Sequence, residues 1–144
     1  MVQAGKFQPD DETLLGMILA VITAAHIAAL GMLESGNDDA AVGKKGERTR
    51  FQMMPNVIAH YPDLAKDPTN AKLAEKYTLQ EWSHRIFHFE AEFNRVPTVK
   101  EIALLWHCPA RVLHPNAEER GYAERFSNLF DSACMSCGVT PVKP

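Results

Sequence analysis

The chain has 144 residues, of which 46% are hydrophobic, and it carries a formal net charge of −3. These values predict one globular domain with a substantial core and exclude a disordered or collagen-like chain. The mild acidity argues against a nucleic-acid binder, because such proteins concentrate basic residues.

The first 33 residues divide into a polar extension and a long apolar run. Residues 1–13 are polar, and the acidic side chains of residues 9–13 predict a helix start near Asp10 or Asp11. Residues 14–33 contain no formally charged side chain. This run is long enough to span a bilayer, but it is weakly hydrophobic and lacks the basic flank of a signal peptide. It is therefore predicted to form one or two buried core helices without stable membrane insertion; a membrane-anchored protein is the alternative.

Glu34 is a carboxylate at the end of this apolar run. Burial disfavours the ionised form, so its pKa is expected to rise until the group can carry a proton near neutral pH, as a general acid requires. The alternative is a glutamate at a helix end that faces water. His26, about two helical turns earlier, is predicted to be a core histidine and not a catalytic partner.

The segment after the apolar run joins two short motifs. The first is Glu-Ser-Gly-Asn at residues 34–37, and the second is Phe-Gln-Met-Met-Pro at residues 51–55, with Gln52 placed 18 residues after Glu34. A loop rich in glycine and charge connects them, and we expect an irregular or β-hairpin segment around residues 39–53. This order and spacing resemble the lytic transglycosylase and goose-type lysozyme superfamily, in which Glu-Ser-Gly is followed by Gly-Leu-Met-Gln-x-Met-Pro.

The resemblance implies roles for individual residues of the two motifs. It makes Glu34 the catalytic acid/base and places Gln52 in a sugar-binding groove. Ser35 and Met54 belong to the same motifs and are expected beside the substrate. The glycine that the family has three residues before the glutamine is Thr49 in this chain.

Glu47 is a second candidate carboxylate, five residues before Gln52. Animal-type lysozymes place their second acidic residue at the same offset before a groove glutamine. Glu47 would then position a water molecule or stabilise an oxocarbenium-like state, as paired carboxylates do in glycosidases. A solvent-exposed charge paired with Arg48 or Arg50 is the alternative.

Two basic clusters lie on the same loop, namely Lys44-Lys45 and Arg48 with Arg50. They are candidates for attracting an anionic polymer. Solvated loop charge is the alternative interpretation.

The middle of the chain is predicted to be helical. A short helix over residues 56–61 is expected to stop at Pro62, and residues 67–70 form a turn with an N-cap. Residues 71–93 have apolar side chains at close to helical spacing, which predicts a long core-facing helix.

Thr98 and Glu101 form a predicted capping box that opens the next helix. This helix is predicted to contain residues 102–112, which resemble the family's second signature, Ala-Leu-Ala-Ala-Tyr-Asn-Ala-Gly-Pro-x-Arg-Val. Trp106 replaces the tyrosine and His107 the asparagine, the two residues that line the glycan groove in the family. The Trp106 ring is expected to pack on sugar C–H bonds while its N–H donates a hydrogen bond. The signature's glycine is absent here, which is expected to alter the groove.

The last predicted helix covers residues 122–130. By the resemblance, Tyr122 matches a tyrosine that reaches toward the catalytic glutamate, with a packed core tyrosine as the alternative. The chain is therefore divided into an extension at 1–13, a lysozyme-like domain at 14–130 and a tail at 131–144.

No metal or organic cofactor is expected. His84 and His88 are four residues apart, but no third ligand is evident. Cys134 and Cys137 form a lone C-x-x-C without the second pair or the context that zinc or redox chemistry requires. With Cys108 the three cysteines allow at most one disulfide, either between Cys134 and Cys137 or between Cys108 and one of them.

The sequence thus predicts a mostly α, lysozyme-like domain that binds peptidoglycan glycan strands. The expected activity is cleavage of the β-1,4 bond between N-acetylmuramic acid and N-acetylglucosamine, as in a lytic transglycosylase with one glutamate acid/base. The alternatives are a hydrolytic lysozyme that uses a second carboxylate and a non-catalytic glycan-binding module. Either activity implies a location in the cell envelope, periplasmic or secreted, or delivery by another route such as a phage.

Overall fold

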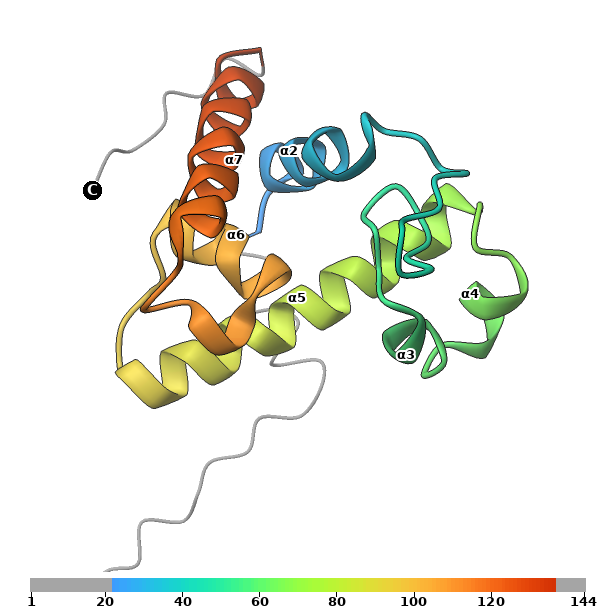
Figure 1. Ribbon diagram of the computed structural model, residues 1–144, viewed down its shortest axis with the longest axis horizontal. Coiled ribbons are helices and arrows are strands. Elements are labelled where there is room, and N and C mark those ends of the chain that lie inside the picture. Colours follow the sequence, from blue (N-terminus) through green and yellow to red (C-terminus); the bar gives the residue numbers. More distant parts are fainter. Residues whose placement is uncertain (1–21, 137–144) are drawn as a thin grey trace, which may run out of the picture.

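The computed structural model describes residues 22–136, and this part of the chain is mostly helical with no strand (Figure 1). The mostly-α prediction is therefore confirmed. The helices are α2 (Ala24–Ser35), α3 (Pro55–Ile58), α4 (Pro62–Lys66), α5 (Ala71–Phe93), α6 (Val99–His107), the 3-10 helix η1 (Pro109–Arg111) and α7 (Ala117–Ser136). The expected helix start near residue 10 lies outside the described residues.

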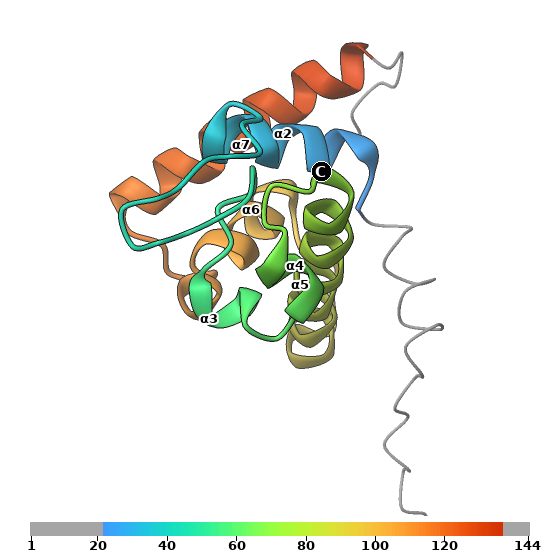
Figure 2. The same ribbon diagram turned by 90° about the vertical axis from the view of Figure 1, so that its right-hand side faces the viewer.

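The longest helix, α5, supports the rest of the molecule. Figure 1 shows α6 and α7 near its C-terminal part, whereas the loop after α2 lies with α3 and α4 near its N-terminal end. In the second view α2 lies along α7 (Figure 2), and these two helices make extensive contact, as do α6 and α7. The side chains of Leu30, Phe51, Trp82, Ile86 and Phe126 are almost completely buried and form the centre of the core.

Polar groups inside the core are held by hydrogen bonds. The Trp82 indole N–H donates to the Ile102 carbonyl over 2.7 Å, which fixes α5 against α6. His26 is buried, as predicted for a core histidine, and its Nδ1 accepts a hydrogen bond from the Thr23 backbone N–H over 3.0 Å. Burial lowers the pKa of His26 to about 4, so the ring is neutral at neutral pH.

The helix caps read from the sequence are present. Asn70 accepts a hydrogen bond from the Leu73 N–H over 3.1 Å and opens α5, whose bounds agree with the predicted 71–93. Thr98 accepts from the Glu101 N–H over 3.2 Å, and the Glu101 carboxylate accepts from the Thr98 N–H over 2.9 Å. The predicted capping box is thus confirmed.

Three helix predictions differ from the structure. The helix predicted to contain residues 102–112 ends at His107 and is followed by η1. The expected helix over 56–61 is shorter and ends at Ile58, and Pro62 opens α4, because proline is well suited to the first turn of a helix. The last helix covers residues 117–136 instead of 122–130. Its start is fixed by Asn116 and Glu119, which hydrogen-bond to each other's backbone N–H groups over 2.9 and 2.7 Å.

None of the helices in the described part, residues 22–136, is long and apolar enough to cross a membrane. The N-terminal part of the predicted apolar run, residues 14–21, lies outside that part.

Candidate active site

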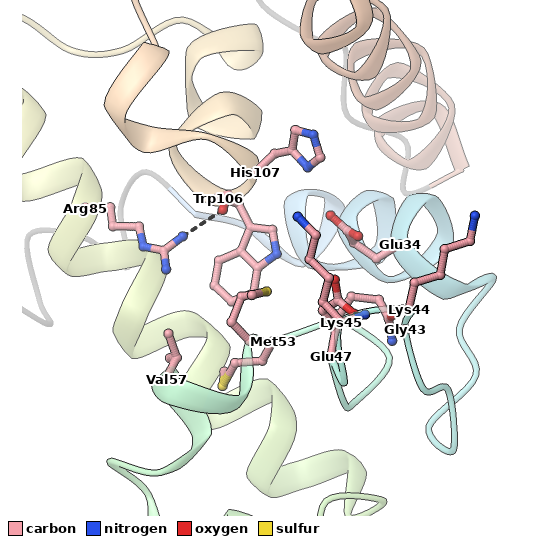
Figure 3. Close-up of a pocket in the computed structure, with 12 residues that line it drawn as sticks. Glu34, Gly43, Lys44, Lys45, Glu47, Met53, Val57, Arg85, Trp106 and His107 are labelled. Carbon is pink, nitrogen blue, oxygen red and sulfur yellow. Dashed lines mark hydrogen bonds between the residues drawn. The ribbon is translucent and has the colours of Figure 1, made fainter.

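A groove of about 420 Å³ opens between the end of α2, the loop that follows it, α3, α5 and the end of α6 (Figure 3). Six of the eight predicted site residues line it, and the other two, Ser35 and Tyr122, do not. The lining residues are Glu34, Gly43, Lys44, Lys45, Glu47, Gln52, Met53, Met54, Val57, Arg85, Trp106 and His107.

Glu34 lies in the last turn of α2, and its carboxyl group is partly buried. The Tyr122 hydroxyl, from α7, donates a hydrogen bond to Glu34 Oε1 over 2.5 Å. Burial raises the pKa of Glu34 to about 7; the Tyr122 hydrogen bond opposes this shift, and the charge of Glu47 adds to it. At neutral pH the carboxyl group is therefore present in both protonated and ionised forms.

His107 lines the groove near Glu34, and the buried Tyr122 stacks on it without lining the groove itself. The two rings stack with centroids 4.0 Å apart and an interplanar angle of 14°. The pKa of Tyr122 is raised well above its usual value, first by burial and then by Glu34, so its hydroxyl stays a donor at neutral pH. The pKa of His107 is lowered, chiefly by burial, which favours the neutral imidazole. Three predicted residues from three helices thus meet at one point.

Trp106 differs from the expectation in one respect. Its ring lines the groove but is only 7% exposed, and its N–H donates to the Phe51 carbonyl over 3.0 Å. That N–H is therefore committed to the loop and is not free for a sugar. Arg85 lies on the other side of the ring, with Cζ 5.0 Å from the ring centroid, and donates to the Trp106 carbonyl over 2.7 Å (Figure 3).

Gly43 allows Glu47 and Gln52 to pack together at the base of the groove. A methyl group at Gly43 would overlap the Glu47 carboxylate and lie 2.6 Å from Gln52 Oε1. The Gly43 N–H donates to the Glu47 carbonyl over 2.9 Å, and the Lys45 N–H donates to Glu47 Oε2 over 2.8 Å. The loop backbone thus holds the second candidate carboxylate in the groove.

The predicted 39–53 segment is irregular, with one isolated β-bridge between Arg48 and Met53. Between these two residues the chain turns through left-handed backbone at Thr49 (φ 71°) and Gln52 (φ 51°). The Gln52 side-chain amide donates to the Thr49 carbonyl over 3.0 Å, and Thr49 Oγ1 accepts from the Phe51 N–H over 3.2 Å. These contacts hold Gln52 at the groove.

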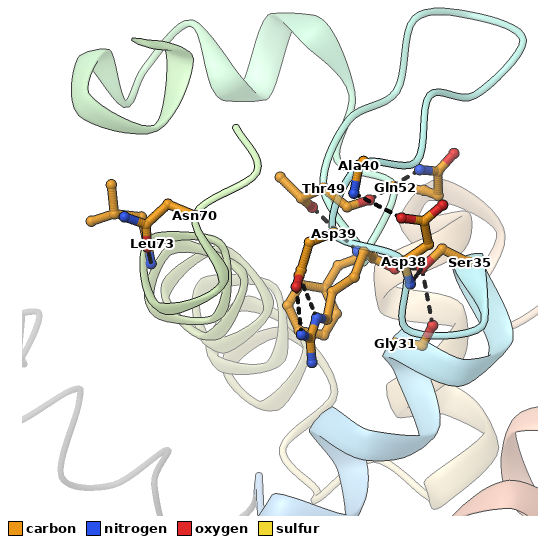
Figure 4. A network of polar contacts seen from close by, with 11 residues as sticks. Gly31, Ser35, Asp38, Asp39, Ala40, Thr49, Gln52, Asn70 and Leu73 are labelled. Carbon is orange, nitrogen blue, oxygen red and sulfur yellow. Dashed lines mark hydrogen bonds and ion pairs between the residues drawn. The ribbon is translucent and has the colours of Figure 1, made fainter. Parts of the chain in front are cut away.

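Ser35 is not among the groove-lining residues. Its hydroxyl donates to the Arg50 carbonyl over 2.7 Å and accepts from the Asp38 N–H over 3.1 Å, which ties the end of α2 to the loop (Figure 4). Arg50 in turn forms a two-point ion pair with Asp39, with distances of 2.7 and 2.9 Å. Within residues 22–136 the charge of Glu47 is not paired with an arginine.

Several groove residues were not singled out by the sequence. Arg85 carried no local signal, because its importance arises from contacts with carbonyls about 20 residues away. Gly43, Met53 and Val57 lay in or beside recognised motifs, but only the folded loop and α3 place them at the groove. Lys44 and Lys45 were noted as a basic cluster, and the structure puts both in the groove wall.

Among residues 22–136, no group of three or more histidine, cysteine, aspartate or glutamate side chains is arranged to hold a metal ion. Cys137 lies outside these residues, so the suggested pairing with Cys134 is not described. Comparisons with protein-family models, curated proteins and solved structures found no match.

Proposed function

We propose that this protein is a peptidoglycan-cleaving glycosidase that acts on the β-1,4 bond between N-acetylmuramic acid and N-acetylglucosamine. The observation that carries the proposal is the Glu34 carboxyl group, which opens onto a groove, accepts a hydrogen bond from Tyr122 and has a pKa of about 7. A general acid works best when its pKa lies near the working pH.

The backbone at Thr49 adds support to the resemblance on which the proposal rests. Its φ of 71° lies in the left-handed region, which favours glycine and is rare for a β-branched residue. The superfamily pattern has a glycine at this position. The left-handed backbone at Thr49 is therefore a conformation that a glycine in the pattern would favour.

In the proposed reaction, protonated Glu34 donates its proton to the glycosidic oxygen as the bond to the sugar's anomeric carbon breaks. The resulting Glu34 carboxylate then accepts the proton of the same sugar's 6-hydroxyl, whose oxygen bonds to the anomeric carbon and closes a 1,6-anhydro ring. Tyr122 engages one carboxyl oxygen, and the other forms no hydrogen bond within residues 22–136. One carboxyl oxygen is thus left for both proton transfers. The reaction proposed here is that of a lytic transglycosylase.

A hydrolytic lysozyme is the second candidate, and the position of Glu47 favours it. Its carboxylate lies in the same groove, and its charge reaches Glu34 strongly enough to raise that group's pKa. Water held by Glu47 would then attack the anomeric carbon in place of the 6-hydroxyl. Neither route requires a metal or an organic cofactor, and both place the protein's activity at the cell envelope.

Mass spectrometry of the soluble products from purified peptidoglycan tests the proposal. Anhydro-ended products that disappear with Glu34→Gln are the expected result, since glutamine keeps the shape of the side chain but cannot donate the proton. Reducing-end products that disappear with the same variant would favour the lysozyme. Binding to peptidoglycan without products from either protein would instead indicate a non-catalytic binding module. Unchanged activity of Glu34→Gln would contradict both enzymatic mechanisms.

A further inference from the structure

The turn that carries Lys44 and Lys45 has a defined backbone. The Gly46 N–H donates to the Gly43 carbonyl over 3.1 Å, and the Gly43 N–H donates to the Glu47 carbonyl over 2.9 Å. Gly46 has a φ of 83°, which a side chain would disfavour. The two lysines therefore extend into the groove wall from a closed turn, and in Figure 3 their side chains lie on either side of Glu34.

Neither lysine forms an ion pair with another residue in the part of the chain that the structure describes. This distinguishes them from several other cations of the molecule, which have carboxylate partners within 4 Å. Those pairs are Arg50–Asp39, Arg95–Glu101, Lys100–Glu124 and Arg111–Glu119. Two exposed, uncompensated ammonium groups thus lie where a substrate would pass.

The groove has a positive charge balance although the protein as a whole has a net charge of −3. Below about pH 7 most Glu34 side chains are neutral, which leaves Glu47 as the negative group of the lining against Lys44, Lys45 and Arg85. A polyanion is not attracted by the net charge of the molecule. Any attraction must therefore be local to the groove.

We propose that the groove selects a glycan whose side groups bear carboxylates, and that Lys44 and Lys45 bind those carboxylates. The inference rests on the proposed function and specifies its substrate class. A neutral polymer of N-acetylglucosamine would leave both ammonium groups without a partner. Two sources of the carboxylate exist in peptidoglycan, namely the lactyl group of peptide-free strands and the acidic residues of the attached peptides.

Calorimetric titration in the Glu34→Gln background measures binding without turnover. Three glycans of equal length serve as probes: a chitin oligosaccharide, a peptide-free glycan with lactyl carboxylates and a peptide-bearing glycan. We expect Lys44→Gln with Lys45→Gln to weaken binding of the carboxylate-bearing glycans about tenfold, since an exposed ion pair contributes roughly two- to fivefold. Binding of the chitin oligosaccharide should not change.

The control removes the same charge from exposed lysines outside the groove, with Lys66→Gln and Lys72→Gln, and should leave every affinity unchanged. If the lysine variant loses affinity for the peptide-free glycan, the lysines bind the lactyl carboxylate. If it loses affinity only for the peptide-bearing glycan, they bind the carboxylates of the peptide. Equal effects on the chitin oligosaccharide, or no effect on any glycan, would overturn the inference while leaving the proposed function standing. Failure of all three glycans to bind the parent would overturn both.

Discussion

Glu34 and Tyr122 are 88 residues apart in the chain, and one hydrogen bond joins them. Three effects act on the carboxyl group: burial and the charge of Glu47 favour the protonated form, while the Tyr122 hydroxyl favours the ionised form. The pKa of about 7 is the net result of these opposing effects. Substitution of Tyr122 and substitution of Glu47 should therefore shift the pKa of Glu34 in opposite directions.

The first prediction concerns the pH dependence of Glu34. Tyr122→Phe removes a donor to the ionised carboxylate, so the pKa of Glu34 should rise. Glu47→Gln removes a nearby negative charge, so the pKa should fall. Because the proposed acid must be protonated, the alkaline limb of kcat/KM should move up in the first variant and down in the second.

Carbon-detected NMR of labelled glutamate measures the same pKa without relying on activity. The ring of phenylalanine keeps the stacking surface for His107, so Tyr122→Phe is a narrow change. Shifts of equal sign in the two variants, or no shift in either, would contradict this account of the site. If the pKa of Glu34 shifts in opposite directions in the two variants while the pH–rate profile stays unchanged, the electrostatic account of the site holds but Glu34 is not the catalytic acid.

Two helix starts were predicted from local caps, whereas the equally local cap of Asn116 and Glu119 at the start of α7 was missed. The caps at Asn70 and Thr98 depend on side chains only three residues apart from their backbone partners, so the pattern alone was sufficient. The division between α3 and α4 was missed because Pro62 can either stop one helix or begin another. The loop conformation could not be predicted from the sequence pattern either, because it depends on the packing of Glu47 and Gln52 against Gly43.

The next prediction concerns the role of Gly43 in the loop and is tested by Gly43→Ala. The new methyl group would displace the ends of two flexible side chains, Glu47 and Gln52, and not the backbone. We expect a loss of less than about 1 kcal/mol in the free energy of unfolding, but a several-fold loss of glycan affinity. Gly121→Ala in α7 is the matched control, since its methyl group meets only Arg125 and alanine stabilises a helix by roughly 0.5–1 kcal/mol. Unchanged affinity in Gly43→Ala would contradict this role of the turn.

At the scale of the whole molecule, the candidate site exists because α2, α6 and α7 converge on one groove wall. Sequence motifs indicated Glu34, His107 and Tyr122 separately, and the structure brings these three together. The motifs carried no information on what supports the wall from behind. That support comes from α5, where the partly buried Arg85 guanidinium donates to the Leu105 and Trp106 carbonyls over 3.1 and 2.7 Å.

Arg85→Met tests this support. The change keeps much of the apolar stem but leaves two carbonyls at the C-terminal end of α6 without a cation, where the helix dipole favours one. We expect the free energy of unfolding, measured by urea denaturation, to fall by about 2 kcal/mol. Arg120→Met removes an exposed arginine that donates to the Pro115 carbonyl over 2.6 Å, and should cost less than about 0.5 kcal/mol. Equal losses in both variants would show that burial of Arg85 between α5 and α6 adds nothing to the stability of the fold.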